Sequence, residues 1–192
     1  MNFLGHLYFS NNDFALMQAN LYGDFVKGKD LSNYPEKIQE GIRLHRRIDN
    51  FIDHHPDVIE LLHLLYEPLP KVAGIAVDLY FDHLLAKNWN IFHDKDYDLF
   101  VNEFYASIDF NNVNYSERFY MMLNKMKEIN WLHYYQFMEG LEKSSYGLSK
   151  RISFPNQLAN APTVFVQYEN QITEVFHKYM IDAKAEFSVN LF

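Results

Sequence analysis

The segment from Ile38 to Ile52 has the period of an amphipathic helix, but two positions on its apolar stripe are polar. Ile38, Ile42 and Ile52 share this stripe with His45 and Asp49. Residues four apart on an α-helix are separated by ~40° around its axis, so His45 and Asp49 are expected to point inward with the isoleucines. A core that buries an imidazole and a carboxylate must supply partners for both groups.

The same pattern recurs in neighbouring predicted helices. Asp78 and Asp82 share an apolar face, His83 follows directly, Asp24 lies beside another apolar stripe, and His6 lies upstream. Imidazole and carboxylate groups without thiolates suit Mn²⁺, Fe²⁺, Zn²⁺ or Mg²⁺. The candidate site residues are His6, Asp24, His45, Asp49, Asp78, Asp82 and His83.

Local ion pairs are the alternative explanation for each of these residues taken singly. Asp49 could pair with Arg46, and Asp24 could be a helix-end acid beside Lys27. Such pairing does not explain why acids and histidines repeatedly occupy the apolar stripes of three successive helices. The spacing therefore favours a metal site or an acid/base site over structural pairing.

Prolines and glycines divide the chain into helical segments, and convincing strands of period two are missing. The expected helices span 13–26, 35–54, 56–66, 71–89, 94–108, 116–129, 131–151 and 163–186. A chain of 192 residues is long enough for one good hydrophobic core. We therefore expect one all-α domain, a helical bundle over residues 1–192.

Composition limits the compartment and the partners. Cysteine is absent, which excludes disulfides and thiolate sites and is compatible with a reducing compartment. The first ten residues lack a signal peptide, and no run approaches the ~18 apolar residues of a membrane span. We expect a soluble cytoplasmic protein without membrane or nucleic-acid partners, because a net charge of −8 disfavours phosphate binding. The oligomeric state is not indicated.

Positive charge is concentrated in one segment. Residues 27–47 contain six basic and three acidic side chains, a net charge of +3, which leaves −11 for the rest of the chain's −8. This segment coincides with the polar stripe and could steer an anionic substrate, although ordinary charge scatter on a solvated helix is the alternative. The candidate docking residues are Lys27, Lys29, Arg46 and Arg47.

Four segments resemble the acyl carrier protein phosphodiesterase family. They are MNFLGH (1–6), NLYGDFVKG (20–28), GIRLHRRID (41–49) and DLYFDH (78–83), and the likeness continues weakly through Trp131 and residues 148–151. Gly5 stands where the family typically has alanine. The resemblance implies an all-helical fold related to HD-type metal-dependent phosphohydrolases, with Mn²⁺ as the usual metal.

The resemblance also implies a reaction and a partner. The family hydrolyses the phosphodiester that joins 4′-phosphopantetheine to a serine of holo acyl carrier protein, an acidic protein, and releases the apo form. In the expected mechanism a divalent cation lowers the pKa of water, the hydroxide attacks phosphorus, and the serine oxygen leaves. The expected metal ligands are Asp24, His45, Asp78 and Asp82. The expected catalytic residues are Asp24, His6, His83 and Asp49.

Several roles within this mechanism stay open. Asp49 could orient His45 or bind metal directly, and either His6 or His83 could protonate the departing oxygen. Arg46 and Arg47 could neutralise phosphate oxygens or form structural ion pairs. Two other functions fit the sequence: a phosphohydrolase of the same fold acting on a nucleotide or small phosphoester, and a helical interaction module without enzymatic activity.

Overall fold

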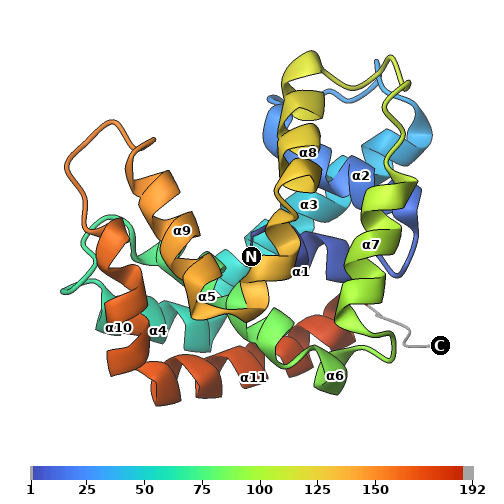
Figure 1. Ribbon diagram of the computed structural model, residues 1–192. Helices are drawn as coiled ribbons and strands as arrows, with labels where there is room; N and C mark the ends of the chain where they lie inside the picture. Colours follow the sequence, from blue (N-terminus) through green and yellow to red (C-terminus); the bar gives the residue numbers. More distant parts are fainter. Residues whose placement is uncertain (1, 188–192) are drawn as a thin grey trace.

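The computed structural model describes residues 2–187, and within them every regular element is a helix (Figure 1). This confirms the all-α expectation. Met1 of the first motif and residues 188–192 of the expected domain lie outside the described residues. The α-helices are α1 (Phe3–Tyr8), α2 (Phe14–Leu21), α3 (Glu36–His54), α4 (Pro56–Leu65), α5 (Ala73–Lys87), α6 (Trp89–Phe92), α7 (Tyr97–Ser107), α8 (Glu117–Glu128), α9 (Met138–Ser149), α10 (Ala161–Gln167) and α11 (Glu169–Phe187). The 3₁₀ helices are η1 (Tyr22–Phe25), η2 (Trp131–Gln136) and η3 (Leu158–Asn160).

Several helices begin at residues that cap the free amides of a first turn. The side chain of Asp13 accepts a hydrogen bond from the Leu16 amide at the start of α2. Asp96 and Ser116 do the same for α7 and α8, and Pro56 is the first residue of α4. These are the residue types that favour helix starts, which is why the sequence predicts these boundaries closely.

Three expected helices are each divided in two. The segment 13–26 forms α2 and η1, 131–151 forms η2 and α9, and 163–186 lies in α10 and α11. Phe137 is extended between η2 and α9. A Cβ on Gly140 would lie 2.0 Å from the carbonyl oxygen of Tyr134, so the start of α9 packs directly on η2. Such tertiary contacts override a helical period.

Helix α1 was not expected. It has six residues and lacks a side-chain cap from its own N-terminal segment. Instead the carboxylate of Asp82 on α5 accepts hydrogen bonds from the amides of Leu4 and Gly5, at 2.8 and 3.0 Å. The residue that caps α1 therefore lies almost eighty positions away, and no local pattern can reveal it.

The helices place α1 and α3 beside the middle of the molecule. Figure 1 shows α5 near the centre, with α2 and α8 on one side and α4 and α10 on the other. Helices α2 and α3 pack along each other. A Cβ on Gly41 would lie 2.4 Å from the Cβ of Ala19, so glycine permits this close approach. Among the described helices, none is both long and apolar enough to cross a membrane.

Candidate metal centre

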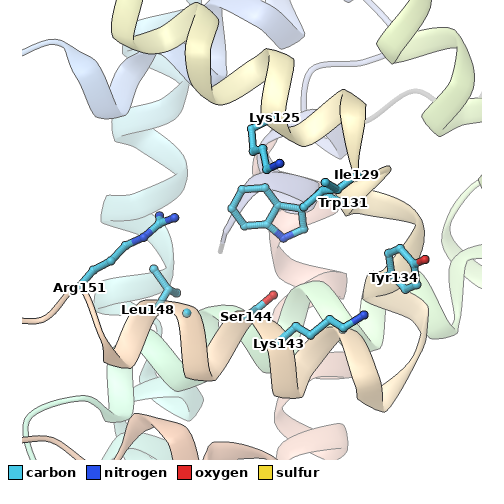
Figure 2. A pocket seen from close by; sticks show the side chains of 10 residues that line it. Lys125, Ile129, Trp131, Tyr134, Lys143, Ser144, Leu148 and Arg151 are labelled. Carbon is cyan, nitrogen blue, oxygen red and sulfur yellow. The ribbon is translucent and has the colours of Figure 1, made fainter.

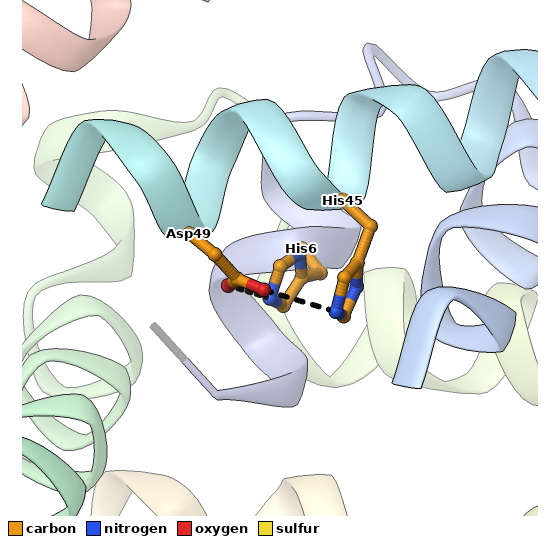
Figure 3. A group of neighbouring side chains, drawn as sticks. All are labelled: His6, His45 and Asp49. Atoms are coloured by element: carbon orange, nitrogen blue, oxygen red, sulfur yellow. Dashed lines mark ion pairs between the residues drawn. The ribbon is translucent and has the colours of Figure 1, made fainter. Parts of the chain in front are cut away.

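His6, His45 and Asp49 form a compact group between α1 and α3 (Figure 3). The two carboxylate oxygens of Asp49 lie 3.3 Å from Nε2 of His6 and 3.2 Å from Nε2 of His45. The two imidazole rings are stacked, with centroids 4.1 Å apart and planes 13° apart. One ligand atom from each residue lies within 4.8 Å of the others, so the three side chains could hold one metal ion.

The 3₁₀ helix η1 is shaped around His45. Gly23 lies in η1, and a Cβ there would lie only 2.3 Å from Cγ of His45. Any larger residue would displace the imidazole. The next residue, Asp24, places Oδ1 3.3 Å from Nε2 of His45. The glycine therefore gives the ring its space, and the aspartate contacts the ring.

Asn20 fixes the orientation of His6. Its Nδ2 donates to the His6 carbonyl at 2.9 Å and to Oγ of Ser10 at 3.0 Å, which leaves Oδ1 facing Nδ1 of His6 at 3.0 Å. An oxygen at that position accepts the Nδ1 proton, so a neutral His6 presents the lone pair of Nε2 to the site. Sequence reasoning missed Asn20, because an amide within a helical segment carries no signal.

The electrostatics of the group favour a bound cation. Burial lowers the pKa of His6, and the approach of Asp49, which raises it, does not make up the difference. A neutral Nε2 and a carboxylate oxygen then face each other as two acceptors 3.3 Å apart. Such a pair needs a cation between or beside its atoms. Nitrogen and oxygen ligands without sulfur suit the divalent metals named above.

His45 differs from His6 in its protonation. Burial lowers the pKa of His45, but hydrogen bonds to Asp24 and Asp49 outweigh burial and raise the pKa to about 9. Burial also disfavours the charge of Asp49, but the hydrogen bond from His45 and the proximity of His6 hold the pKa of Asp49 well below the usual range. A proton on His45 thus occupies the place of a metal ion, and a metal must displace it.

The group opens into a polar cavity of about 260 Å³. Its lining residues are Asn2, His6, Asp24, Asp49, Ile52, Asp53 and Asp78. The side chains of Asp49 and Asp24 are 44% and 58% exposed. His45 is buried as expected. Asp49 was expected in the core as well, but its side chain lines the cavity and its carboxylate is partly exposed to water.

Asp53 is a lining residue that sequence reasoning missed. It lies one helical turn beyond Asp49 on α3, a spacing that repeats the interval from His45 to Asp49. Burial raises the pKa of Asp53, and the charges of Asp78 and Asp49 raise it further. Asp53 therefore holds a proton more readily than an ordinary aspartate.

The structure does not bring Asp82 and His83 into this group. Asp82 is fully buried, and its two oxygens receive the Leu4 and Gly5 amides. Successive residues of a helix lie ~100° apart, which turns His83 to another face of α5. There its Nδ1–H donates to the Tyr135 carbonyl at 2.8 Å. Asp82 supports the site indirectly, because it holds the start of the helix that carries His6.

The expected docking residues divide into two pairs. Arg46 donates hydrogen bonds to the carbonyls of Val26 and Gly28, at 3.2 and 2.7 Å. Arg47 forms an ion pair with Glu186 at 2.9 Å. Both arginines thus have structural partners, the alternative considered for them. Lys27 and Lys29 are exposed.

Comparisons with known proteins show what this chain is similar to. A family model described as acyl carrier protein phosphodiesterase matches residues 1–183. Curated proteins named acyl carrier protein phosphodiesterase from Salmonella agona (strain SL483) and Salmonella newport (strain SL254) are each 31% identical over 152 residues, which is 79% of this chain and 79% of theirs. No solved structure matches the chain, so the likeness to HD-type folds stays a prediction. The chain belongs to the acyl carrier protein phosphodiesterase family.

Proposed function

We propose that this chain hydrolyses the phosphodiester between 4′-phosphopantetheine and a serine of holo acyl carrier protein, which yields the apo protein. Family membership supports the reaction. The observation that carries the proposal is the pair of facing acceptors, Nε2 of His6 and the Asp49 carboxylate, in a cavity that gathers four aspartates. A cavity of that charge repels a phosphodiester unless a cation compensates it.

In this proposal His6, His45 and Asp49 hold a divalent metal, with Asp24 as a further ligand from η1. We propose that this metal is Mn²⁺, because Mn²⁺ is the usual metal of the family that the sequence resembles. The metal supplies charge compensation for the phosphate and a reactive nucleophile from water at neutral pH. Asp78 lines the same cavity. We therefore propose that Asp78 faces the metal, as the sequence predicts. We leave Asp82 and His83 out of the proposed ligand set, because their side chains have other partners.

The chain's own residues orient the ligands and move the proton. Asn20 holds the His6 ring so that Nε2 faces the cavity. When water attacks phosphorus and the bond to the serine oxygen breaks, that oxygen must gain a proton. Asp53 is our candidate donor, because it lines the cavity and its pKa is raised. This role replaces the one expected for either His6 or His83.

The test combines the substrate with the metal. The purified protein is incubated with Mn²⁺ and holo acyl carrier protein, and the products are analysed by mass spectrometry. Loss of the phosphopantetheine group from the carrier protein, dependent on metal and abolished by a chelator, is the expected result. An unchanged holo protein, together with cleavage of nucleotides or other small phosphoesters, would overturn the substrate assignment and leave only a phosphohydrolase.

A further inference from the structure

A second and larger cavity lies between α8, η2 and α9. It has a volume of about 490 Å³, and Figure 2 shows Lys125 and Trp131 reaching toward it opposite Leu148, Ser144 and Arg151 of the α9 side. The lining residues are Lys125, Ile129, Trp131, Tyr134, Gly140, Lys143, Ser144, Gly147, Leu148 and Arg151. We call this space the α9 cavity. Its size is within the usual range for a small-molecule site.

The lining of the α9 cavity is apolar and cationic. Ile129, Trp131 and Leu148 give it apolar surface, while Lys125, Lys143 and Arg151 contribute three positive charges. No lining residue is acidic, in a chain whose net charge is −8. The two lysines pair with glutamates on their own helices, but exposed pairs of this kind contribute less than about 1 kcal/mol and exchange readily for another anion.

Gly147 keeps part of this cavity open. Gly140 and Gly147 lie two turns apart on α9, but only Gly140 has a packing reason, since its Cβ would strike the Tyr134 carbonyl. No atom lies within 4 Å of where a Cβ on Gly147 would stand. Glycine inside a helix costs about 1 kcal/mol relative to alanine. No close packing at Gly147 offsets that cost. The missing side chain leaves free volume that faces the cavity.

Helix α1 connects the α9 cavity to the metal centre. The rings of Phe3 and Trp131 meet edge to face, with centroids 5.4 Å apart. Trp131 lines the α9 cavity, whereas Asn2, directly before Phe3, lines the polar cavity together with His6. Residues at the first turn of α1 therefore link the two cavities: Asn2 lines the polar cavity, and Phe3 contacts Trp131 of the α9 cavity.

We propose that the α9 cavity binds the pantetheine arm of the holo carrier protein. This inference rests on the proposed function, which places the phosphate of the arm at the metal centre. The arm continues from that phosphate as a long uncharged chain with methyl and amide groups, and it must leave the polar cavity. The apolar walls beside Trp131 suit such a chain. The cations at the rim suit the acidic protein from which the arm extends, so both parts of the substrate find complementary surface.

The first experiment fills the cavity at Gly147. G147F should raise the KM for holo carrier protein about tenfold, because the new ring occupies the space of the arm. G74F is the matched control, since a Cβ on the exposed Gly74 of α5 also meets no atom within 4 Å. The control should keep the wild-type KM. Stabilisation of both variants by Mn²⁺ in thermal unfolding verifies that the fold and the metal centre persist.

The second experiment measures binding without catalysis. Trp131 and Trp89 are the two tryptophans of the chain, and Trp89 is buried. Pantetheine alone should change the fluorescence of the wild-type protein, and the change should disappear in W131F and in G147F. An unchanged signal in the wild type, or a wild-type KM for a folded G147F, would overturn the arm site.

The two proposals fail in distinguishable ways. If the wild-type protein converts holo carrier protein but G147F does so with the same KM, the function stands and the arm site is wrong. If pantetheine changes Trp131 fluorescence but holo carrier protein is never cleaved, the α9 cavity binds the arm and the proposed reaction is wrong.

Discussion

The polar cavity at the candidate metal centre and the α9 cavity differ in charge and in lining. The polar cavity gathers four aspartates and His6 in about 260 Å³. The α9 cavity has nearly twice that volume, three cations and no acid. Carboxylates and imidazoles can hold a metal and transfer protons, whereas apolar walls with a cationic rim can only recognise and position. Chemistry and substrate binding are thus assigned to separate cavities.

This separation predicts separate kinetic effects. Substitutions in the polar cavity should lower turnover and metal affinity, because the side chains there act on the metal and on the reacting phosphate. Substitutions in the α9 cavity should raise KM and leave metal binding intact, since they remove contacts with a part of the substrate that does not react.

The largest effect is expected at Asp49, which contacts both imidazoles. D49N keeps the shape of the side chain but removes its charge, so we expect turnover to fall at least ~10²-fold and Mn²⁺ affinity to fall with it. Steady-state kinetics and calorimetric metal titration measure these losses. D98N is the control, because Asp98 forms a comparable pair with His133 at 2.8 Å outside the polar cavity. A folded D49N with near-wild-type turnover would remove Asp49 from the site.

Metal affinity should depend on pH through His45. Its pKa is raised to about 9, so a metal binding at neutral pH must displace a proton, and affinity should rise ~10-fold per pH unit between pH 7 and 9. The metal-free protein should show the opposite trend in stability. A pKa that is raised in the folded state stabilises the fold fully below 6.5, the ordinary pKa of histidine, and this contribution is lost as pH rises through 9.

Thermal unfolding with and without Mn²⁺ checks both trends. The difference in melting temperature between the two conditions should widen from pH 7 to pH 9. In H45Q, which cannot titrate in this range, the pH dependence of metal binding should be much weaker. A constant difference in the wild-type protein would mean that His45 carries no proton that the metal displaces.

A smaller loss is expected from the residue that orients His6. N20A removes the acceptor of the Nδ1 proton, so the ring can rotate and the metal affinity should fall ~10- to 100-fold. Turnover at saturating metal should recover much of its wild-type value. Calorimetry at several metal concentrations tests this. Unchanged affinity in a folded N20A would show that packing alone orients the ring.

The smallest effect concerns long-range attraction. Lys27 and Lys29 are exposed and follow Asp24 closely in the sequence. Their replacement by glutamate should lower kcat/KM for the acidic carrier protein ~3-fold at low salt and less at high salt. Cleavage of a small phosphodiester should change little. If both substrates lose activity equally, these lysines serve the fold or the metal centre rather than docking.

Helical spacing predicts the part of the site that lies on one helix. His45 and Asp49 are one turn apart on α3, so their proximity follows from local geometry, and Asp24 is found beside them. Spacing does not predict partners across the chain. In the sequence Asp82 looks like a fourth inward acid, but its partners are backbone amides of α1. Helix α1 is too short to show a helical period in the sequence.

The supporting residues escape sequence reasoning for a related reason. Asn20 matters only because folding places it against His6, and Gly147 only because folding leaves open space where its Cβ would stand. An amide or a glycine in a helical segment has many structural explanations. Their roles depend on distances that exist only after the helices have packed.

The most direct test of the account is the position of a metal ion in a crystal of the protein grown with Mn²⁺. Anomalous scattering locates manganese independently of the surrounding atoms. We predict one strong peak within bonding distance of Nε2 of His6, Nε2 of His45 and the Asp49 carboxylate. A peak at Asp82 and His83 instead, or a fully occupied crystal site that excludes both imidazoles, would contradict the assignment of the metal centre.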